Sequence, residues 1–133
     1  MHGEAAGDAL RIMLDTHALI WALEASPQLS KAARSLIEDP NNEVLVSAAS
    51  AWEIAIKKAL GRLKVPNDLI EAVDEAGFVR RPLGFGEAQR LESLPRHHED
   101  PFDRMILAHA LEEGATLVTR DRQIARYQVP IVW

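Results

Sequence analysis

Four acidic residues are of a type and placement that could serve one chemical site: Asp15, Glu53, Asp103 and Asp121. Like charges in one pocket repel, and without a counter-charge some of them would take up protons. A divalent cation removes that repulsion, and Mg²⁺ prefers hard oxygen ligands and keeps several waters. Such an ion can polarise a phosphodiester and activate a bound water. The four carboxylates therefore predict a metal centre with hydrolytic activity.

Two of these acids also have a structural explanation. Asp15 precedes Ala18–Leu23, which is apolar on every side, so a carboxylate beside this buried segment needs a partner, a capping role or a metal. Glu53 stands three residues after Ser50, the spacing of a helix capping box. Its spacing from Lys57 also fits an ion pair on a helix surface. From the residues alone, metal binding and capping both remain open for Glu53.

The segment Asp100-Pro101-Phe102-Asp103 contains two acids with different expected roles. Asp100 directly before Pro101 has the pattern of a helix N-cap, so we assign it a structural role. Asp103 would lie in the first helical turn, where the helix dipole alone could explain it. Because the helix beyond it is apolar almost all round, we expect Asp103 to have a specific partner.

The elements that would position these acids alternate along the chain. Apolar runs predict buried strands at 11–14, 44–46, 116–118 and 131–132, with a further short strand at 78–80. Helices are expected at 18–24, 31–38, 51–63, 67–75, 86–93 and 101–113, with Ser30 as an N-cap and Gly114 closing the last. Trp52, Ile56, Leu60 and Leu63 are expected to form the core stripe of their helix.

This alternation predicts an α/β fold, a three-layer sandwich with a small, mostly parallel central sheet. The carboxyl ends of parallel strands lie along one edge of such a sheet, and ligands bind there. Asp15 and Asp121 both follow predicted strands and should meet at this edge. Five further residues near it are candidates for contacts to phosphate or RNA: Thr16, Ser47, Thr119, Arg104 and Arg120. For the three hydroxyl residues, hydrogen bonding in turns and helix caps remains an equal alternative.

Composition limits the alternatives. The 133 residues fit one domain over 11–133, and we treat 1–10 as an N-terminal extension without assigned function. No secretory signal or membrane-spanning stretch is recognisable, so a cytoplasmic location without membrane contact is expected. The net charge of −5 argues against a general nucleic-acid binder, although a bound cation would offset carboxylates at a metal site. The five histidines, His97 and His98 included, do not show metal-ligand spacing.

The chain resembles the PIN-domain family and, within it, the VapC-type toxins of type II toxin–antitoxin systems. The resemblance covers nearly all of 12–133. It rests on four stretches in this order: Asp15 to Trp21, Ser47 to Lys57, Asp100 to Arg104 followed by Ile106-Leu107-Ala108, and Leu117 to Asp121.

The resemblance implies a role for each acid and a set of partners. Asp15, Glu53 and Asp103 match the family's metal-binding and catalytic acids, and Asp121 matches its more variable fourth position. The implied activity is Mg²⁺- or Mn²⁺-dependent cleavage of RNA, including structured RNA such as tRNA. A homodimer, a VapB-like antitoxin that blocks the site and a higher assembly with that antitoxin are also implied.

Two other hypotheses remain at this stage. A catalytically silent, dimeric binding module for RNA or a protein partner would fit the acidic net charge and the capping interpretations of Glu53 and Asp100. An aspartate-based phosphatase would fit Asp15 after the first strand, but such enzymes want a second Asp two residues later, where this chain has His17.

Overall fold

The structure is a computed structural model that describes residues 9–65 and 68–133. The predicted extension 1–10 therefore falls almost wholly outside the described residues, and the domain assignment of that segment stays a prediction. The strands are β1 (Arg11–Leu14), β2 (Glu43–Ser47), β3 (Val79–Arg81), β4 (Thr116–Val118) and β5 (Ile131–Val132). The helices are α2 (Thr16–Leu23), α3 (Lys31–Glu38), α4 (Ala48–Ala59), α5 (Leu69–Glu75), α6 (Phe85–Ser93), α7 (Pro101–Glu113) and the 3₁₀ helix η1 (Arg122–Arg126).

The five strands form one sheet in the order β3-β2-β1-β4-β5, and every neighbouring pair is parallel. This confirms the predicted fold class. β1 lies at the centre, where Leu14 pairs with Val46 on one side and Val118 on the other. Because all strands point the same way, the chain leaves β1 and β4 at the same edge, and Asp15 and Thr119 follow directly.

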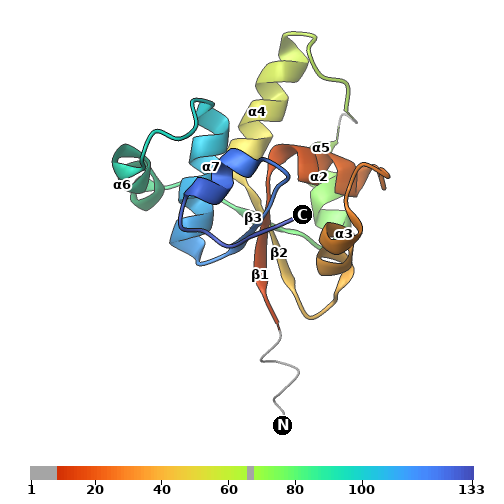
Figure 1. Ribbon diagram of the computed structural model, residues 1–133. Helices are drawn as coiled ribbons and strands as arrows, with labels where there is room; N and C mark the ends of the chain where they lie inside the picture. The colour runs from red at the N-terminus through yellow and green to blue at the C-terminus, as the bar shows by residue number, and fades with distance from the viewer. Residues whose placement is uncertain (1–8, 66–67) are drawn as a thin grey trace.

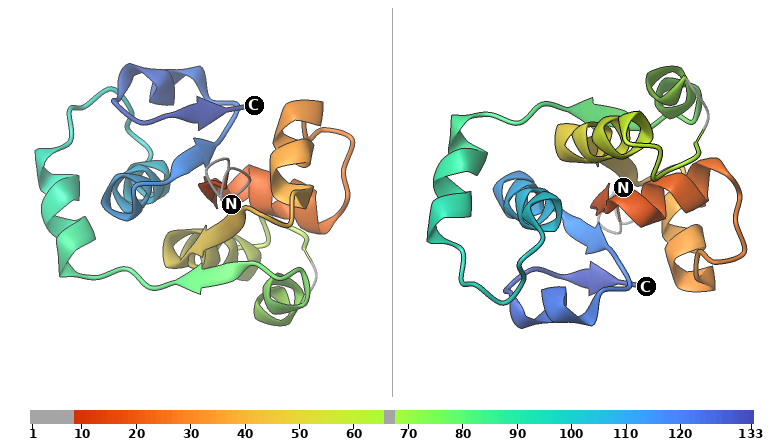
Figure 2. Two further views of the ribbon diagram at one scale, coloured as in Figure 1. Left: turned by 90° about the horizontal axis from the view of Figure 1, so that it is seen from below. Right: turned by 90° about the horizontal axis from the view of Figure 1, so that it is seen from above.

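Alternate residues of the strands build two separate cores. Ile12 and Leu14 pack under α2, α3 and α5, whereas Met13 packs with Ile106 and Leu107 of α7 on the opposite face. Figure 2 shows the sheet between these two sets of helices, with α6 lying outside α7. The strands have no exposed face in the centre of the sheet, which explains their continuous apolar sequences.

Helix α4 differs from its prediction in two ways. It begins at Ala48 with Ser47 as N-cap, because the Ser47 hydroxyl accepts the Ala49 N–H, so the expected capping box from Ser50 to Glu53 is wrong. The expected core stripe is also wrong for most of its members: the exposed fractions are 53% for Trp52, 49% for Ile56 and 61% for Leu60. The helix projects away from the sheet, so its far end has no core to face (Figure 1).

Helix α7 is the longest helix of the described chain and was predicted with its bounds. Asp100 is its N-cap and accepts hydrogen bonds from the N–H groups of Phe102 and Asp103. Gly114 ends it in the left-handed conformation, with φ of 63°, as the sequence indicated. α7 thereby places Asp103 at the site edge and Glu113 at the opposite end. None of the described helices could span a bilayer.

Candidate metal centre

Asp15 is held where β1 meets α2. Its backbone N–H donates to the carbonyl of Val118 in β4, which fixes the strand end, and its Oδ1 accepts the N–H of Ala18 at 2.8 Å as the N-cap of α2. Burial raises the pKa of Asp15; hydrogen bonds from Thr119 and Ala18 oppose the shift, and the charge of Glu53 adds to it. The carboxylate therefore caps a helix and still carries an unfavourable charge, so a cation nearby would stabilise it.

Glu53 lies on the inner face of α4, with 4% of its surface exposed. The Thr16 hydroxyl donates to its Oε1 at 2.5 Å, and the Lys57 ammonium donates to its Oε2 at 2.6 Å. The ion pair with Lys57 follows the predicted spacing of four residues. These two contacts, one to each oxygen, hold the carboxylate in one orientation. A catalytic or metal-binding acid needs to be oriented in this way.

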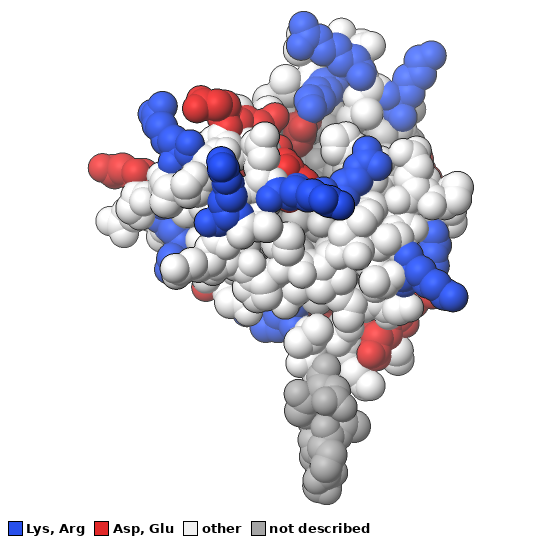
Figure 3. Space-filling model, viewed as in Figure 1, with Lys and Arg blue, Asp and Glu red and all other residues white. Residues whose placement is uncertain are grey.

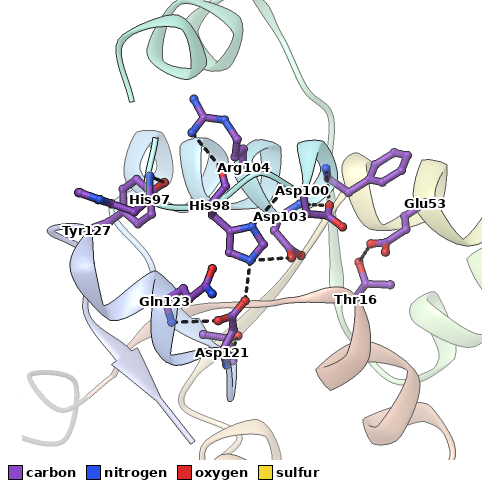
Figure 4. A network of polar contacts seen from close by, with 12 residues as sticks. Thr16, Glu53, His97, His98, Asp100, Asp103, Arg104, Asp121, Gln123 and Tyr127 are labelled. Atoms are coloured by element: carbon purple, nitrogen blue, oxygen red, sulfur yellow. Dashed lines mark hydrogen bonds and ion pairs between the residues drawn. The ribbon is translucent and has the colours of Figure 1, made fainter. Parts of the chain in front are cut away.

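Asp103 and Asp121 are brought together through His98. The His98 Nε2 lies 2.6 Å from Asp121 Oδ2 and 3.2 Å from Asp103 Oδ2 (Figure 4). Ligand atoms of these three residues all lie within 4.8 Å of one another, a separation that one metal ion can bridge. Asp121 is also the N-cap of η1, where its Oδ1 accepts the N–H of Gln123.

Several carboxylates lie close to Asp103 at this edge of the sheet. Burial, and after it repulsion from Asp100, Glu53 and Asp15, together raise the pKa of Asp103 from 3.8 to about 7, while His98 opposes the shift. A partly buried carboxylate that resists ionisation beside other carboxylates is typical of functional sites, where a cation would favour the charged form.

A divalent cation fits these residues. The donors are hard oxygen atoms, their charges repel one another in the metal-free protein, and Asp103 and Asp121 already have their oxygens close together. The structure brings Asp103 and Asp121 together, and Asp15 and Glu53 lie near enough to Asp103 to raise its pKa. Metal binding by these four acids stays a prediction.

Comparison with known proteins identifies the family. The PIN domain model matches residues 12–130, which is most of the chain.

The chain belongs to the PIN domain family.

Two curated proteins that this chain resembles are both named as ribonucleases. This PIN domain is 30% identical over 122 residues to ribonuclease VapC22 of Mycobacterium tuberculosis, covering 90% of this chain and 93% of that protein. A shorter match, 54% identical over 33 residues, links it to ribonuclease VapC16 of the same organism and covers 25% of this chain and 23% of that protein. The long match covers nearly the whole length of both chains.

Solved structures confirm the fold. VapBC2 from Rickettsia felis, bound to a DNA fragment from its promoter, matches with a TM-score of 0.69 at 17% identity over 93% of this chain and 99% of the other. A toxin–antitoxin complex from Klebsiella pneumoniae matches with a TM-score of 0.64 at 18% identity over 92% and 96%. DNA-bound VapBC from Salmonella typhimurium gives 0.66 at 18% identity over 92% and 97%. At these identities the likeness concerns the fold.

The predicted hydroxyl contacts of this PIN domain lie beneath its surface. Thr16 and Thr119 are almost fully buried, and each binds a site acid or its backbone: Thr16 donates to Glu53, and Thr119 Oγ1 accepts the Asp121 N–H. Ser47 is fully buried and its hydroxyl lies 2.7 Å from His109 Nδ1. Because a buried hydroxyl cannot reach an RNA strand directly, the placement of Ser47 supports a structural role.

The two predicted arginines differ in their surroundings. Arg120 is exposed and its guanidinium lies over the ring of Trp21, 4.6 Å from the ring centroid. Arg104 instead directs its guanidinium at the carbonyls of Pro95 and His98 and of the end of α6. Arg120 is thus available to a ligand, whereas Arg104 holds the segment that leads to His98. An RNA contact by either residue stays a prediction.

His98 is the site residue that the sequence reasoning missed. It was set aside because His97-His98 lacks the spacing of a helical metal-binding motif. Its place in the cluster depends on the path of the chain between α6 and α7, which no local pattern shows. Its position in the sequence could have indicated a place near the site, because it stands two residues before Asp100, the N-cap of the helix that carries Asp103.

Basic residues surround the acids. Figure 3 shows acidic atoms in the upper half of one face with Lys and Arg side chains on several sides of them. Lys57 on α4 and Arg120 after β4 are two of these basic residues. A negatively charged ligand that approaches a metal-loaded site would therefore meet cations around it, even though the whole chain carries a net charge of −5.

Proposed function

We propose that this PIN domain is a Mg²⁺- or Mn²⁺-dependent endoribonuclease that cleaves RNA phosphodiester bonds and acts as a toxin neutralised by a VapB-like antitoxin. The observation that carries the proposal is the convergence of Asp103 and Asp121 at the sheet edge, in the field of Asp15 and Glu53. The long match to a ribonuclease of the VapC group supports it. Structured RNA such as tRNA is the proposed class of substrate.

Asp15, Glu53, Asp103 and Asp121 are the proposed ligands and catalytic acids. When bound, the metal supplies a Lewis acid for the phosphodiester and an activated water. Thr16 and Lys57 hold the two oxygens of Glu53, and the N–H of Ala18 holds Asp15, so these acids are oriented before substrate arrives. Preorganised groups need little rearrangement during the reaction. This preorganisation is the main source of electrostatic catalysis.

Arg120 is the proposed phosphate contact at the rim. Stacking on Trp21 limits its movement while its guanidinium keeps donors that can bind phosphate oxygens. It directly precedes Asp121 in the chain, so a phosphate bound there would lie next to the acidic cluster. Replacement of Arg120 should weaken RNA binding more than metal binding.

Cleavage of RNA in the presence of metal tests the proposed activity. Purified protein with a mixed tRNA substrate should produce defined fragments with Mg²⁺ or Mn²⁺ and none with EDTA. Asp15→Asn is the matched variant, because asparagine keeps an oxygen that can cap α2 but removes the charge. Cleavage that survives both EDTA and Asp15→Asn would reject the metal mechanism. Mn²⁺ binding without cleavage of any RNA would favour the silent binding module.

Two exposed apolar grooves are the proposed partner surfaces. One, of about 320 Å³ between α4 and α6, is lined by Trp52, Leu83, Phe85, Ala88, Leu91 and Met105, with Glu87 the charged residue at its wall. The other, of about 880 Å³ between α4 and α5, contains Leu69 and Ile70, and its charged lining consists of four acids, Asp68, Glu71, Asp74 and Glu75, against one lysine, Lys58. Phe85 is 92% exposed, far more than a large apolar side chain usually is in a protein without partners.

The charges favour a different partner for each groove. A twofold dimer brings the same patch of two copies together, so the acidic border of the α4–α5 groove would repel itself. The α4–α6 groove lacks that border and suits a homodimer, whereas the α4–α5 groove suits a basic, amphipathic antitoxin segment. Occupation of both grooves would produce the higher assembly predicted from the resemblance.

The mass of the protein in solution tests this assignment. Light scattering with size-exclusion chromatography should give a dimer for the natural protein and a monomer for Phe85→Ser. Ile70→Ser on the other groove should leave the dimer intact and weaken capture by the antitoxin encoded beside the toxin. A dimer that persists in Phe85→Ser would reject the α4–α6 interface. The predicted cytoplasmic location stays a prediction.

A further inference from the structure

The His98 imidazole occupies the middle of the acidic cluster, yet the proposed activity assigns it no task. Its side chain is 13% exposed and its Nε2 faces two of the proposed metal ligands, Asp121 at 2.6 Å and Asp103 at 3.2 Å. Figure 4 shows the ring between these two carboxylates, with its second nitrogen turned toward Asp100. A residue with this position can act either as a metal ligand or as a group that orients the ligands.

The second ring nitrogen decides between these roles. The backbone N–H of Asp100 donates to His98 Nδ1 at 3.1 Å, so Nδ1 is an acceptor and carries no proton. In a neutral imidazole the proton is then on Nε2, which must donate to Asp121 and Asp103. A protonated Nε2 has no lone pair for a metal. Metal ligation would require the proton to move to Nδ1 and the bond from Asp100 to break.

The bond that fixes the ring belongs to the start of α7. Asp100 uses its N–H for His98 and its Oδ1 to cap the N–H groups of Phe102 and Asp103. Arg104 of the same helix turn reaches back to the carbonyls of Pro95 and His98. Residue 98 is therefore tied at its backbone and at its ring to the turn that carries Asp103, and it extends that turn to Asp121.

We propose that His98 is a positioning residue of the metal centre, an Nε2–H donor that holds the Asp121 and Asp103 carboxylates together and does not bind the ion itself. The proposal rests on the proposed metal-dependent function. Each carboxylate oxygen has two lone pairs, so Asp121 Oδ2 can accept from His98 and still bind a cation. Carboxylate ligands are commonly oriented by such outer partners, whose loss lowers metal affinity by about 10- to 100-fold.

Variants of residue 98 distinguish the roles of the two ring nitrogens, Nε2 and Nδ1. His98→Gln keeps an N–H donor at the reach of Nε2 and should retain most of the affinity for Mg²⁺ and Mn²⁺ in calorimetric titration. His98→Asn can still accept the Asp100 N–H but cannot reach the carboxylates, so its affinity should fall by about 10- to 100-fold, as in His98→Leu. His97→Leu is the matched control, because the His97 ring packs on Tyr127 outside the cluster.

Two measurements distinguish positioning from ligation. Loss of a positioning residue lowers the affinity for Mg²⁺ and Mn²⁺ by the same factor. An imidazole ligand favours Mn²⁺, so loss of a ligand would lower the Mn²⁺ affinity more. Nitrogen-15 NMR of the His98 ring should show the Nε2–H tautomer in EDTA and again with saturating Mg²⁺. Melting temperatures of all variants in EDTA report whether each variant is folded.

Four outcomes would overturn the proposal. A switch to the Nδ1–H tautomer on Mg²⁺ binding would make His98 a ligand, and so would a loss of affinity confined to Mn²⁺. Unchanged affinity in folded His98→Leu and His98→Asn would leave it no positioning role, while the proposed function would stand on the metal binding of the natural protein. If the natural protein itself binds neither ion, the metal-dependent function fails and the positioning role fails with it.

Discussion

The acids at the two ends of helix α7 have pKa values shifted in opposite directions. At its start, burial and three neighbouring carboxylates raise the pKa of Asp103 to about 7. Near its end, burial alone would raise the pKa of Glu113, but hydrogen bonds from Arg81 and Arg11 outweigh it and leave the pKa below its ordinary value. Arg81 Nε lies 2.7 Å from Glu113 Oε2 and Arg11 Nη2 lies 2.6 Å from Oε1.

This contrast separates an acid that stabilises the fold from one that we propose to be catalytic. Glu113 joins the amino end of β1 to the end of β3 and has its charge matched within the protein. Asp103 is partly buried near Asp100, Glu53 and Asp15, and His98 offsets their effect only in part, because the pKa stays raised to about 7. Protonation or a cation from outside would relieve the remaining repulsion. A fold that maximised its own stability would not gather these acids, so we attribute their grouping to function.

The largest predicted effect is at the start of α7. Asp103→Asn should reduce RNA cleavage on the order of a thousandfold, because a lost metal ligand removes several kcal/mol of transition-state stabilisation. Glu113→Gln should leave the rate per folded molecule unchanged. Single-turnover cleavage of one defined RNA by both variants measures this. Equal losses in the two variants would remove the distinction between the two ends.

The pH dependence of stability is the next prediction. Asp103 in the folded, metal-free protein keeps its proton up to pH about 7, whereas in the unfolded chain it loses the proton near 3.8. The unfolded state thus binds fewer protons between these values, and stability falls as the pH rises through this window, by up to about 4 kcal/mol. The raised pKa of Asp15 acts in the same direction.

Urea unfolding in EDTA between pH 5 and pH 8 checks this dependence. Asp103→Asn should flatten the curve, since it removes the titrating group, and saturating Mg²⁺ should stabilise the natural protein most at the higher pH. The lowered pKa of the buried His109 acts in the opposite direction at the acidic end of this range, so the comparison with Asp103→Asn decides. The same pH dependence of stability in both proteins would contradict the raised pKa of Asp103.

A smaller effect is expected at the end of α7. Glu113→Gln should lower the free energy of unfolding by about 1–3 kcal/mol, the usual contribution of hydrogen bonds to charged groups, and leave Mn²⁺ affinity unchanged. Chemical denaturation and calorimetric titration of the same preparation measure both quantities. A clear loss of Mn²⁺ affinity in Glu113→Gln would contradict this and show that the two ends of α7 are coupled.

The smallest effect is expected from the exposed ion pair between Arg90 of α6 and Glu112 of α7, 2.6 Å apart. Arg90→Gln should change stability by less than about 1 kcal/mol, because exposed pairs lose as much in solvation and entropy as they gain. Thermal unfolding measures it and provides the baseline for Glu113→Gln. A change as large as that of Glu113→Gln would mean that burial of Glu113 contributes little.

Much of the architecture could be predicted because its signals are local. The bounds of β1, β4, β5, α3 and α7 follow from apolar runs and from caps such as Ser30, Asp100 and Gly114. The parallel sheet follows from the alternation of strands and helices, and it brings the residues after β1 and β4 to one edge. The acids of the site then follow from their places after these strands and in the first turn of α7.

The remaining features depend on tertiary contacts. Helix α4 has apolar residues on two faces, and periodicity alone could not tell that Ile54 faces the core while Trp52 and Ile56 face solvent. Its start moved from Ala51 to Ala48 because Ser47 ends β2 and caps the helix at once. His98 reaches the cluster across 23 residues to Asp121, a contact that no helix or strand period encodes.

The central claim is that four acids form a divalent metal centre: Asp103 at the start of α7, Asp15 after β1, Glu53 on α4 and Asp121 after β4. A crystal structure of the natural protein grown with millimolar Mn²⁺, with anomalous diffraction data, tests it most directly. The account predicts an anomalous peak between the carboxylates of Asp103 and Asp121, in reach of Asp15 and Glu53. The absence of any such peak in well-ordered density for these four acids would contradict it.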